Sequence, residues 1–393
     1  MKKFSKNNAI TLIVLVITII VLLILAGVTI ATLTGENGIL TRSTEAKKKT
    51  EESKEEELRK LTQAEAATYL EEYEYTDTNG EKVRIPAKCA VSQVDYERTI
   101  KTGLVIIDSL GNSYVWIDVP KTTTVYSQAG IELTNFTEKA LNDIYEDLKR
   151  YTKTYRIDCD DIYHEGIGLS LENYISLKNK MLTSIYQNGG FWVGQYETGS
   201  ELYSNADDSA QRQPVIKKGA YPYNYISCSN AQDLATRFST NNTTGSLLFG
   251  IQWDLILKFI EQNGNKTVSQ LKNNSNEWGN FKDATFTLTQ GKYLISPDSS
   301  IKWETINNAF FKPADSFPIL LTTGATDRNS CINIYDLAGN VGEWTLEKSL
   351  NNDKPLVRRG GSCTNSNYPV YGRGTSPVGG SIDCYIGFRV TLF

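Results

Sequence analysis

The chain has 393 residues, a length that allows about two or three domains. Hydrophobic residues make up 40% of it and charged residues 22%, which is ordinary for a folded protein and excludes a mainly disordered chain. The formal net charge of −4 gives no basic character, so we expect no nucleic-acid partner. The six cysteines form no metal-knuckle or CxxC pattern, and the sequence contains a single histidine.

The N-terminus has the pattern of a membrane anchor. Lys2, Lys3 and Lys6 precede an apolar run over residues 10–33. At 1.5 Å per residue, a helix of this length spans a hydrocarbon core of about 30 Å. Because no basic residue follows until Arg42, residues 1–9 are predicted to be a cytoplasmic leader. We therefore expect a single-pass protein of the cell membrane with an extracellular C-terminal domain. A cleaved signal peptide is the alternative, but the run is too long and has no A-x-A site.

The same segment resembles the leader and membrane helix of type IV pilins and pseudopilins. A short basic leader ends in a small residue, Ala9, and residues 10–14 open the membrane helix. Family leaders usually end in Gly, and Glu usually stands fifth after cleavage, where this chain has Val14. The resemblance implies an anchor of pilin-like ancestry, and a pilin-like filament subunit processed after Ala9 is an alternative function.

Residues 34–75 are predicted to form a charged helical stalk. Lysine and glutamate blocks alternate at helical spacing between residues 44 and 70, without Pro or Gly. The apolar stripe is thin, which favours a solvated helix over a coiled-coil seam. A turn signal at residues 77–80 ends the stalk, and residues 76–102 are predicted to be a connecting segment.

The remaining chain, residues 103–393, alternates between strand and helix patterns. Over residues 103–119, β-branched and aromatic runs flank a Gly-Asn turn, which predicts a hairpin. Periodic apolar residues predict helices over 139–150 and 169–186, and an apolar run over 189–197 predicts a buried strand. This mixture predicts an α+β domain.

Three short blocks stand out near the C-terminus: Ile334–Trp344 (IYDLAGNVGEW), Arg359–Ser362 (RGGS) and Gly387–Val390 (GFRV). Gly339 and Asn340 tolerate left-handed backbone angles, so a sharp reversal is expected there. The acid and the tryptophan that close the first block place a carboxylate beside a ring large enough to anchor a core.

In this order the three blocks resemble the formylglycine-generating-enzyme (sulfatase-modifying-factor) family, a branch of the C-type-lectin-like fold. Other segments match the family in order and type: GLVIIDSLGNSYVWIDV at 103–119, GGFWVGQYE at 189–197, a helix at 230–238, a helix at 247–260 and WGN at 278–280. The resemblance implies a C-type-lectin-like domain over residues 103–393.

Two enzyme activities known on this fold need residues that this chain does not have in place. Ergothioneine-type sulfoxide synthases hold non-haem iron with several histidines, whereas His164 stands alone and is predicted in a loop or at the surface. Formylglycine-generating oxidases bind Cu(I) through cysteines at the third and eighth places after GGS, which here are Asn365 and Val370. Cys363 stands two residues early and Cys384 far along, and a structural disulfide between them is the alternative to a copper pair. We expect a non-enzyme without a redox cofactor, with a formylglycine-generating-type oxidase as the alternative.

The resemblance also implies a calcium site at the turn of the first block. The matching ligands are Asp336, Gly339, Val341 and Glu343, which would give two carboxylates and two backbone carbonyls, the hard donors that Ca²⁺ takes. The alternative is a metal-free turn in which Asp336 and Glu343 accept hydrogen bonds from backbone amides.

The segment between Gly360 and Gly387 is rich in Tyr, Asn, Ser and Asp, residue types that dominate antibody paratopes. In the lectin-like fold it forms an exposed face of loop and strand. It resembles the variable proteins of diversity-generating retroelements, in which the last segment of a lectin-like domain is diversified for binding; a fixed surface is the alternative. The candidate ligand-binding residues are Asn365, Ser366, Asn367, Tyr368, Tyr371, Ser381, Asp383 and Tyr385.

The sequence thus predicts a membrane-anchored, surface-displayed protein. Its non-catalytic lectin-like domain would bind a protein or cell-surface ligand through the C-terminal segment.

Overall fold

The computed structural model describes residues 18–20, 22–23, 39–203, 212–264, 266–295, 302–380 and 382–393. The chain divides into two units, Met1–Leu58 and Arg59–Phe393. The predicted leader and nearly all of the predicted membrane helix, residues 10–33, lie outside the described residues. Among the helices that are described, none combines the length and the apolar character needed to cross a membrane.

The predicted stalk is helical over α2 (Ile39–Ala66). Within the first unit, its described side chains are mostly exposed, and lysine–glutamate pairs form at i, i+4 spacing. From Arg59 onward the helix belongs to the second unit, where Thr62 and Ala66 are buried. The Arg59 guanidinium donates to Glu97 and to Gln195 Oε1. The helix therefore ends as part of the compact unit, not as a solvated stalk.

The turn at residues 77–80 has a different role from the one predicted. It joins β1 (Tyr73–Thr76) to β2 (Lys82–Ile85) in an antiparallel hairpin, and α2 has already ended at Ala66. Asp77 fixes this turn, since its Oδ1 accepts the backbone N–H groups of residues 79 and 81.

The larger sheet of the second unit has six antiparallel strands in the order β10-β22-β7-β5-β4-β3. Their bounds are β3 (Cys89–Val91), β4 (Val105–Asp108), β5 (Ser113–Asp118), β7 (Gly190–Gly194), β10 (Gly245–Leu247) and β22 (Val390–Leu392). The predicted hairpin at 103–119 is confirmed as β4–β5, and the strand predicted at 189–197 forms over β7. Because β3 pairs with β4, the sheet starts inside the predicted connecting segment, before residue 103.

The described α-helices of this unit that follow α2 are α3 (Glu138–Tyr151), α4 (Leu171–Asn188), α5 (Cys228–Thr236), α6 (Gly250–Asn263) and α7 (Val268–Lys272). Four of them, α3, α4, α5 and α7, begin at a Ser or Thr cap, whereas α6 begins after Phe249 and is mostly buried. The predicted helices at 139–150, 169–186 and 230–238 are confirmed within two residues at each end. The helix predicted at 247–260 starts later than expected, because Leu247 is the last residue of strand β10 and α6 begins at Gly250.

The second sheet brings the three C-terminal blocks together. Its strands run in the order β20-β19-β18-β21, with β6 paired to the far end of β18. Their bounds are β6 (Cys159–Asp160), β18 (Gly342–Ser349), β19 (Leu356–Arg359), β20 (Arg373–Ser376) and β21 (Ile386–Phe388). Glu343 on β18 lies opposite Arg359 on one side and Gly387 on the other. Blocks separated in sequence are therefore immediate neighbours.

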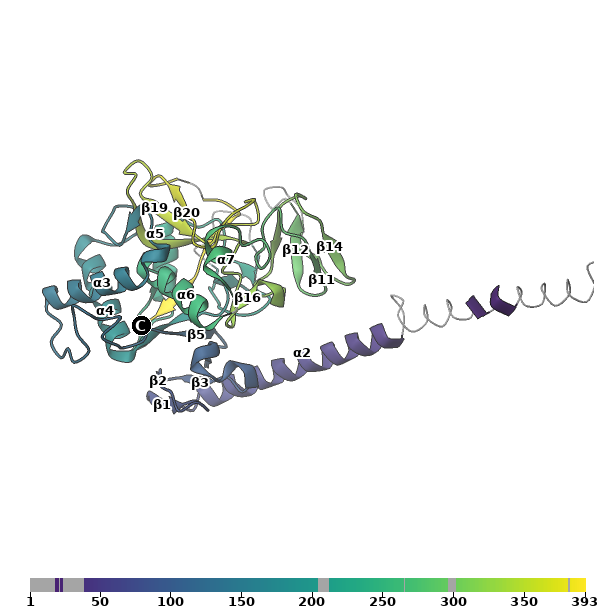
Figure 1. Cartoon of the computed structure of the whole chain (residues 1–393), viewed down its shortest axis with the longest axis horizontal. Coiled ribbons are helices and arrows are strands. Elements are labelled where there is room, and N and C mark those ends of the chain that lie inside the picture. Colours follow the sequence, from purple (N-terminus) through teal and green to yellow (C-terminus); the bar gives the residue numbers. More distant parts are fainter. Residues whose placement is uncertain are drawn as a thin grey trace, which may run out of the picture. The chain divides into compact units, whose positions relative to one another are not determined.

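The remaining strands are short and form small sheets. They are β8 (Gly199–Ser200), β9 (Tyr221–Pro222), β11 (Phe286–Leu288), β12 (Lys292–Ile295), β13 (Glu304–Thr305), β14 (Phe310–Lys312), β15 (Ile319–Leu321), β16 (Ser330–Cys331) and β17 (Ile334–Tyr335). In Figure 1, α3 and α4 lie at one end of the unit and β11, β12 and β14 at the other, with α6 and α7 between them.

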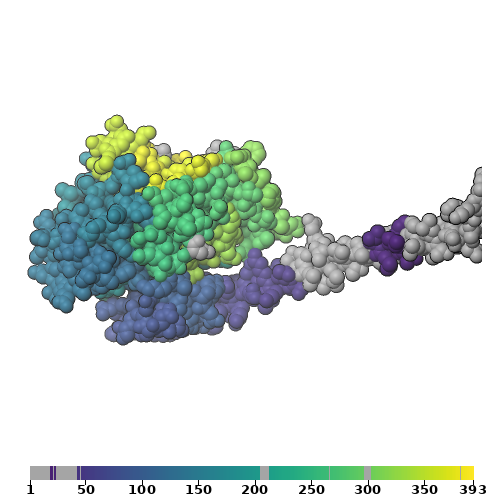
Figure 2. Space-filling model, viewed as in Figure 1, coloured from purple at the N-terminus to yellow at the C-terminus, as the bar shows by residue number. Residues whose placement is uncertain are grey.

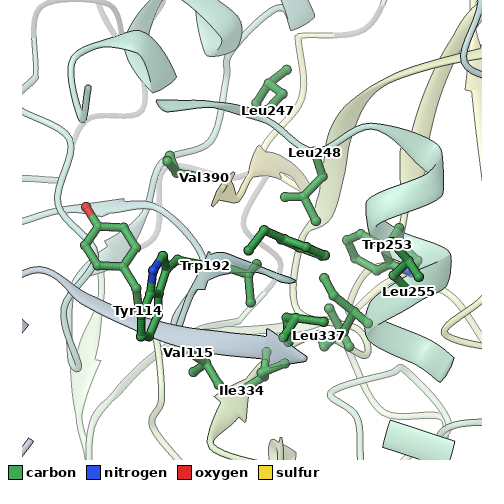
Figure 3. Close-up of a cluster of buried hydrophobic side chains, with 14 of the residues drawn as sticks. Tyr114, Val115, Trp192, Leu247, Leu248, Trp253, Leu255, Ile334, Leu337 and Val390 are labelled. Atoms are coloured by element: carbon green, nitrogen blue, oxygen red, sulfur yellow. The ribbon is translucent and has the colours of Figure 1, made fainter. Parts of the chain in front are cut away.

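Helix α6 links the two larger sheets, because it packs against both β5 and β18. Figure 3 shows part of the hydrophobic core, with Trp192 of β7 beside Tyr114 of β5, and with Trp253 and Leu255 of α6 on the other side of the view; all four side chains are buried. Trp344 is fully buried, as expected for the aromatic anchor of the first block. The second unit is thus an α+β structure around one main core.

Candidate functional site

The turn of the first block makes the reversal that the sequence predicts. Gly339 and Asn340 have φ values of 81° and 59°. A Cβ on Gly339 would lie 2.3 Å from the carbonyl oxygen of Asn280, so only glycine fits. The buried Asn340 side chain accepts from Asn280 and from the N–H of Leu321, and donates to Glu197 at 2.7 Å. These bonds fix the turn to three other segments of the chain.

A buried ion pair then joins the first block to the last. The fully buried Arg389 donates to both carboxylate oxygens of Glu343, at 2.6 to 3.0 Å. It also donates to the carbonyl oxygens of Gly194 and Tyr335, each at 2.9 Å. Burial raises the pKa of Glu343 to about 6, although the Arg389 charge opposes that rise.

The predicted calcium ligands have protein partners in this structure. The Asp336 carboxylate accepts the N–H of Gly324 at 2.7 Å and the side chain of Asn329 at 3.3 Å, while Arg389 holds Glu343. Within the described residues, no cluster of three or more His, Cys, Asp or Glu side chains is placed to hold a metal ion. For Asp336 the geometry matches the predicted alternative of a hydrogen-bonded turn, whereas Glu343 takes an arginine in place of a backbone amide. Calcium binding through these carboxylates, Gly339 and Val341 stays a prediction.

A second buried network starts from the RGGS block. Arg359 is fully buried and donates to Glu347 at 3.0 Å and to Asp254 of α6 at 2.8 Å. Arg373 of β20 donates to the same two carboxylates, and Arg156 donates to Asp254 at 3.1 Å. Burial opposes ionisation of Glu347, but Arg359 and Arg373 outweigh it and lower the pKa of that carboxyl. Strands β18, β19 and β20 are thereby tied to α6.

Between these fixed strands, the C-terminal segment lines a surface pocket of about 230 Å³. Four of the predicted ligand-binding residues lie in its wall: Asn365, Tyr368, Asp383 and Tyr385. We call this space the C-terminal pocket. Figure 2 shows that the last part of the chain (yellow) forms surface along one face of the unit.

The other predicted residues lie around this pocket or outside the description. Ser366 and Asn367 are exposed in the loop between Asn365 and Tyr368. Tyr371 lines a neighbouring pocket of about 410 Å³, which Tyr368 also lines. Ser381 lies outside the described residues.

The three tyrosines of the segment are half-buried. The ring of Tyr368 packs against Phe281 with centroids 6.4 Å apart, and the Lys272 ammonium lies 5.5 Å from the Tyr371 ring centroid. Tyr385 packs against a small apolar cluster beneath it. Each ring is therefore held by the core on one side while part of it remains accessible, which is the arrangement of a rigid contact residue.

Sequence reasoning missed Arg358, which also lines the C-terminal pocket. It is half-buried, its guanidinium carbon lies 5.6 Å from the Trp344 ring centroid, and burial lowers its pKa. Its buried Nε has no hydrogen-bond partner in the described part of the chain. The sequence signal was strand alternation: in β19, Arg359 faces the core, so its neighbour must face the opposite side.

Two further sequence expectations can be compared with the structure. Cys363 and Cys384 are buried, and no disulfide joins them. Burial raises the pKa of the Cys363 thiol well above its usual range. Burial and the hydrogen bond to Asp383 raise the pKa of the Cys384 thiol to about 12. His164 lies in a loop, which is one of the two predicted places, but it is buried and not at the surface. Its Nδ1 lies 3.0 Å from the Glu165 carbonyl oxygen.

Comparisons of the chain with protein-family models, with curated proteins and with solved structures found no match. The family resemblance therefore depends on the sequence blocks alone.

Proposed function

We propose that the unit Arg59–Phe393 is a C-type-lectin-like domain of the formylglycine-generating-enzyme type that binds a ligand without catalysis. The ligand would contact the C-terminal pocket and its rim. The observation that carries this proposal is that four binding residues chosen from the sequence line one pocket with a half-buried arginine.

The division of the C-terminal region into framework and loop supports the proposal. The three blocks lie on adjacent strands and are held by buried arginine–carboxylate pairs. Between the second and third blocks, Ser366 and Asn367 form an exposed loop, and the tyrosines of the segment are half-buried. A rigid support with an accessible rim of Tyr, Asn and Ser is suited to binding, because little conformational freedom is lost when the ligand docks.

The state of the cysteines supports binding over oxidation. A thiol must ionise to serve as a nucleophile or a soft metal ligand. Burial raises the pKa of both Cys363 and Cys384, so neither is poised as a thiolate. The formylglycine-generating-type oxidase remains the alternative function. Anaerobic Cu(I) titration followed by an assay of peptide-cysteine oxidation would reveal it.

The proposal extends to where the domain acts. Residues 10–33 would anchor the chain in the cell membrane as a single pass, with the C-terminal domain outside, where it meets a protein or cell-surface ligand. We further propose that the chain is the variable protein of a diversity-generating retroelement. A near-repeat of the final coding segment, differing mainly at adenines and next to a reverse-transcriptase gene, would support this; a genome without one would refute it.

The binding proposal is tested with ligands selected on the protein itself. The full chain in detergent is used to select binders from a random-peptide display library and a glycan array, and each binder is retested on Tyr368→Ala/Tyr371→Ala/Tyr385→Ala. We expect affinity to fall at least ~30-fold, since one hot-spot tyrosine contributes about 2 kcal/mol. Tyr75→Ala, which removes a half-buried tyrosine from the β1–β2 hairpin, is the matched control and should keep full affinity.

A second variant avoids any effect on packing. Ser366→Arg adds bulk at an exposed position of the loop, and Ser53→Arg adds the same bulk on the exposed face of α2. Only the first should block the selected binders. Equal binding by wild type, the tyrosine variant and Ser366→Arg would refute the proposed function.

A further inference from the structure

The arginines of the C-terminal framework share one property that Arg358 does not. Arg359, Arg373 and Arg389 each form an ion pair with a buried carboxylate. Arg358 forms no ion pair with any described residue, and its buried Nε has no acceptor there. The Asp383 carboxylate of the same pocket favours the charged form of Arg358, but burial outweighs it and lowers the Arg358 pKa, so a partly desolvated cation without an ion pair is unfavourable in the free protein. A bound group could supply the missing acceptor.

Glycines on the strands on both sides of Arg358 leave space beside its side chain. Gly374 lies opposite it on β20, and a Cβ there would be 3.6 Å from Nη2. Gly342 on β18 lines the same pocket, and a Cβ there would be 3.8 Å from the Arg358 Cβ. Neither glycine has a positive φ. Their backbone conformation is therefore open to other residues, and what glycine adds is space beside the guanidinium at Gly374 and beside the aliphatic part of the Arg358 side chain at Gly342.

Two other polar groups of the pocket define what can enter. The Asn365 side chain accepts the N–H of Ser362 at 2.8 Å through Oδ1, which leaves its Nδ2 group as a donor. Asp383 accepts from the Cys384 thiol at 3.1 Å and from the N–H of Tyr385 at 3.3 Å, and it keeps a negative charge near the pocket. That charge disfavours a dianionic phosphate more than a singly charged carboxylate.

We propose that the C-terminal pocket binds a carboxylate of a peptide ligand, with Arg358 as the bidentate donor and Asn365 as a further donor. A planar guanidinium fork matches a carboxylate in geometry and charge. A pocket of about 230 Å³ suits one acidic side chain or one chain terminus. The paratope-like rim favours a peptide over a sugar acid as the source. This inference deepens the proposed function and rests on it for the biological ligand, but defined probes test the pocket directly.

The experiment titrates the full chain with four probes by ligand-observed NMR. The probes are N-acetyl-glycyl-alanine, the same dipeptide with an amidated C-terminus, glucuronate and inorganic phosphate. We expect the free carboxylate to bind at least ~10-fold more tightly than the amide, because charge-assisted bonds are about twice as strong as neutral ones. Arg358→Gln should abolish this preference, and Arg358→Lys should retain part of it. Arg237→Gln, at the exposed residue that follows the last turn of α5, should leave it unchanged.

Several results would overturn the inference. Equal binding of carboxylate and amide, an unchanged preference in Arg358→Gln, no binding of the carboxylate dipeptide, or binding of glucuronate or phosphate alone would each do so. Failure here is distinguishable from failure of the proposed function. Selected binders that are lost in the tyrosine variant but kept by Arg358→Gln would refute only the carboxylate. Binders kept by the tyrosine variant, together with an Arg358-dependent dipeptide, would refute only the wider binding surface.

Discussion

Replacing Arg389 by methionine tests the buried framework that holds the C-terminal segment. Arg389 makes all of its hydrogen bonds inside the protein, to the Glu343 carboxylate and to the carbonyl oxygens of Gly194 and Tyr335. Arg389→Met keeps much of the volume but leaves a buried carboxylate unpaired. Breaking such a pair typically costs about 3–5 kcal/mol. We expect a loss of that size in the free energy of unfolding at pH 8.

The pH dependence of this loss has a definite sign. Burial already raises the pKa of Glu343 to about 6 with Arg389 present, and removing that charge must raise it further. When a carboxyl has a higher pKa in the folded protein than in the unfolded chain, the free energy of unfolding falls as pH rises through the folded-state pKa. The cost of Arg389→Met should therefore be smaller at pH 5 than at pH 8.

Urea denaturation followed by circular dichroism gives the two free energies, with Arg237→Met as an exposed control near zero. The double variant Arg389→Met/Glu343→Gln should be less destabilised than the sum of the single variants, because the unpaired charge is gone. A cost below about 1 kcal/mol for Arg389→Met at pH 8, or additive single variants, would refute the role assigned to this pair.

Three shorter predictions concern other parts of the unit. Lys312 is fully buried and donates to three backbone carbonyls, and burial lowers its pKa to about 8 from the ordinary 10.5. Because the unfolded chain binds a proton that the folded chain has lost, the free energy of unfolding of the wild type, measured relative to Lys312→Met, should rise by up to about 3 kcal/mol between pH 8 and pH 10. A difference that does not change with pH would contradict this. Gly361→Ala should lower the free energy of unfolding by about 1–3 kcal/mol, and by more than Gly219→Ala does. Both glycines have a positive φ, but only a Cβ at residue 361 would lie 2.5 Å from the Tyr368 ring. Equal losses in the two variants would contradict the clash. Complete chelation should leave the melting temperature unchanged if protein bonds alone hold the turn at Asp336, whereas a loss restored by calcium would establish the predicted metal site.

Local patterns predicted much of the fold. The hairpin at 103–119, the helices at 139–150 and 169–186, and the left-handed turn at Gly339–Asn340 depend on residues close in sequence, and each is confirmed. The packing of α2 depends on residues far from it in the chain. The thin apolar stripe of α2 did not indicate that the last turns of this helix, from Arg59 onward, pack within the unit Arg59–Phe393.

The candidate site shows the same limit. The paratope-like composition led to four residues of the C-terminal pocket, but composition does not say which charges are already paired. Arg359 and its partner Asp254 are 105 residues apart in the sequence, and Arg373 is 119 residues from the same aspartate. Arg358 stands next to Arg359 and has the same chemistry, and only the three-dimensional structure shows that its pairing differs.

Hydrogen–deuterium exchange of the full chain with and without its tightest selected binder tests the binding surface most directly. The account predicts slower exchange over residues 358–385 and unchanged exchange elsewhere. Protection confined to the larger pocket of about 780 Å³ beside α4, with residues 358–385 unchanged, would contradict it.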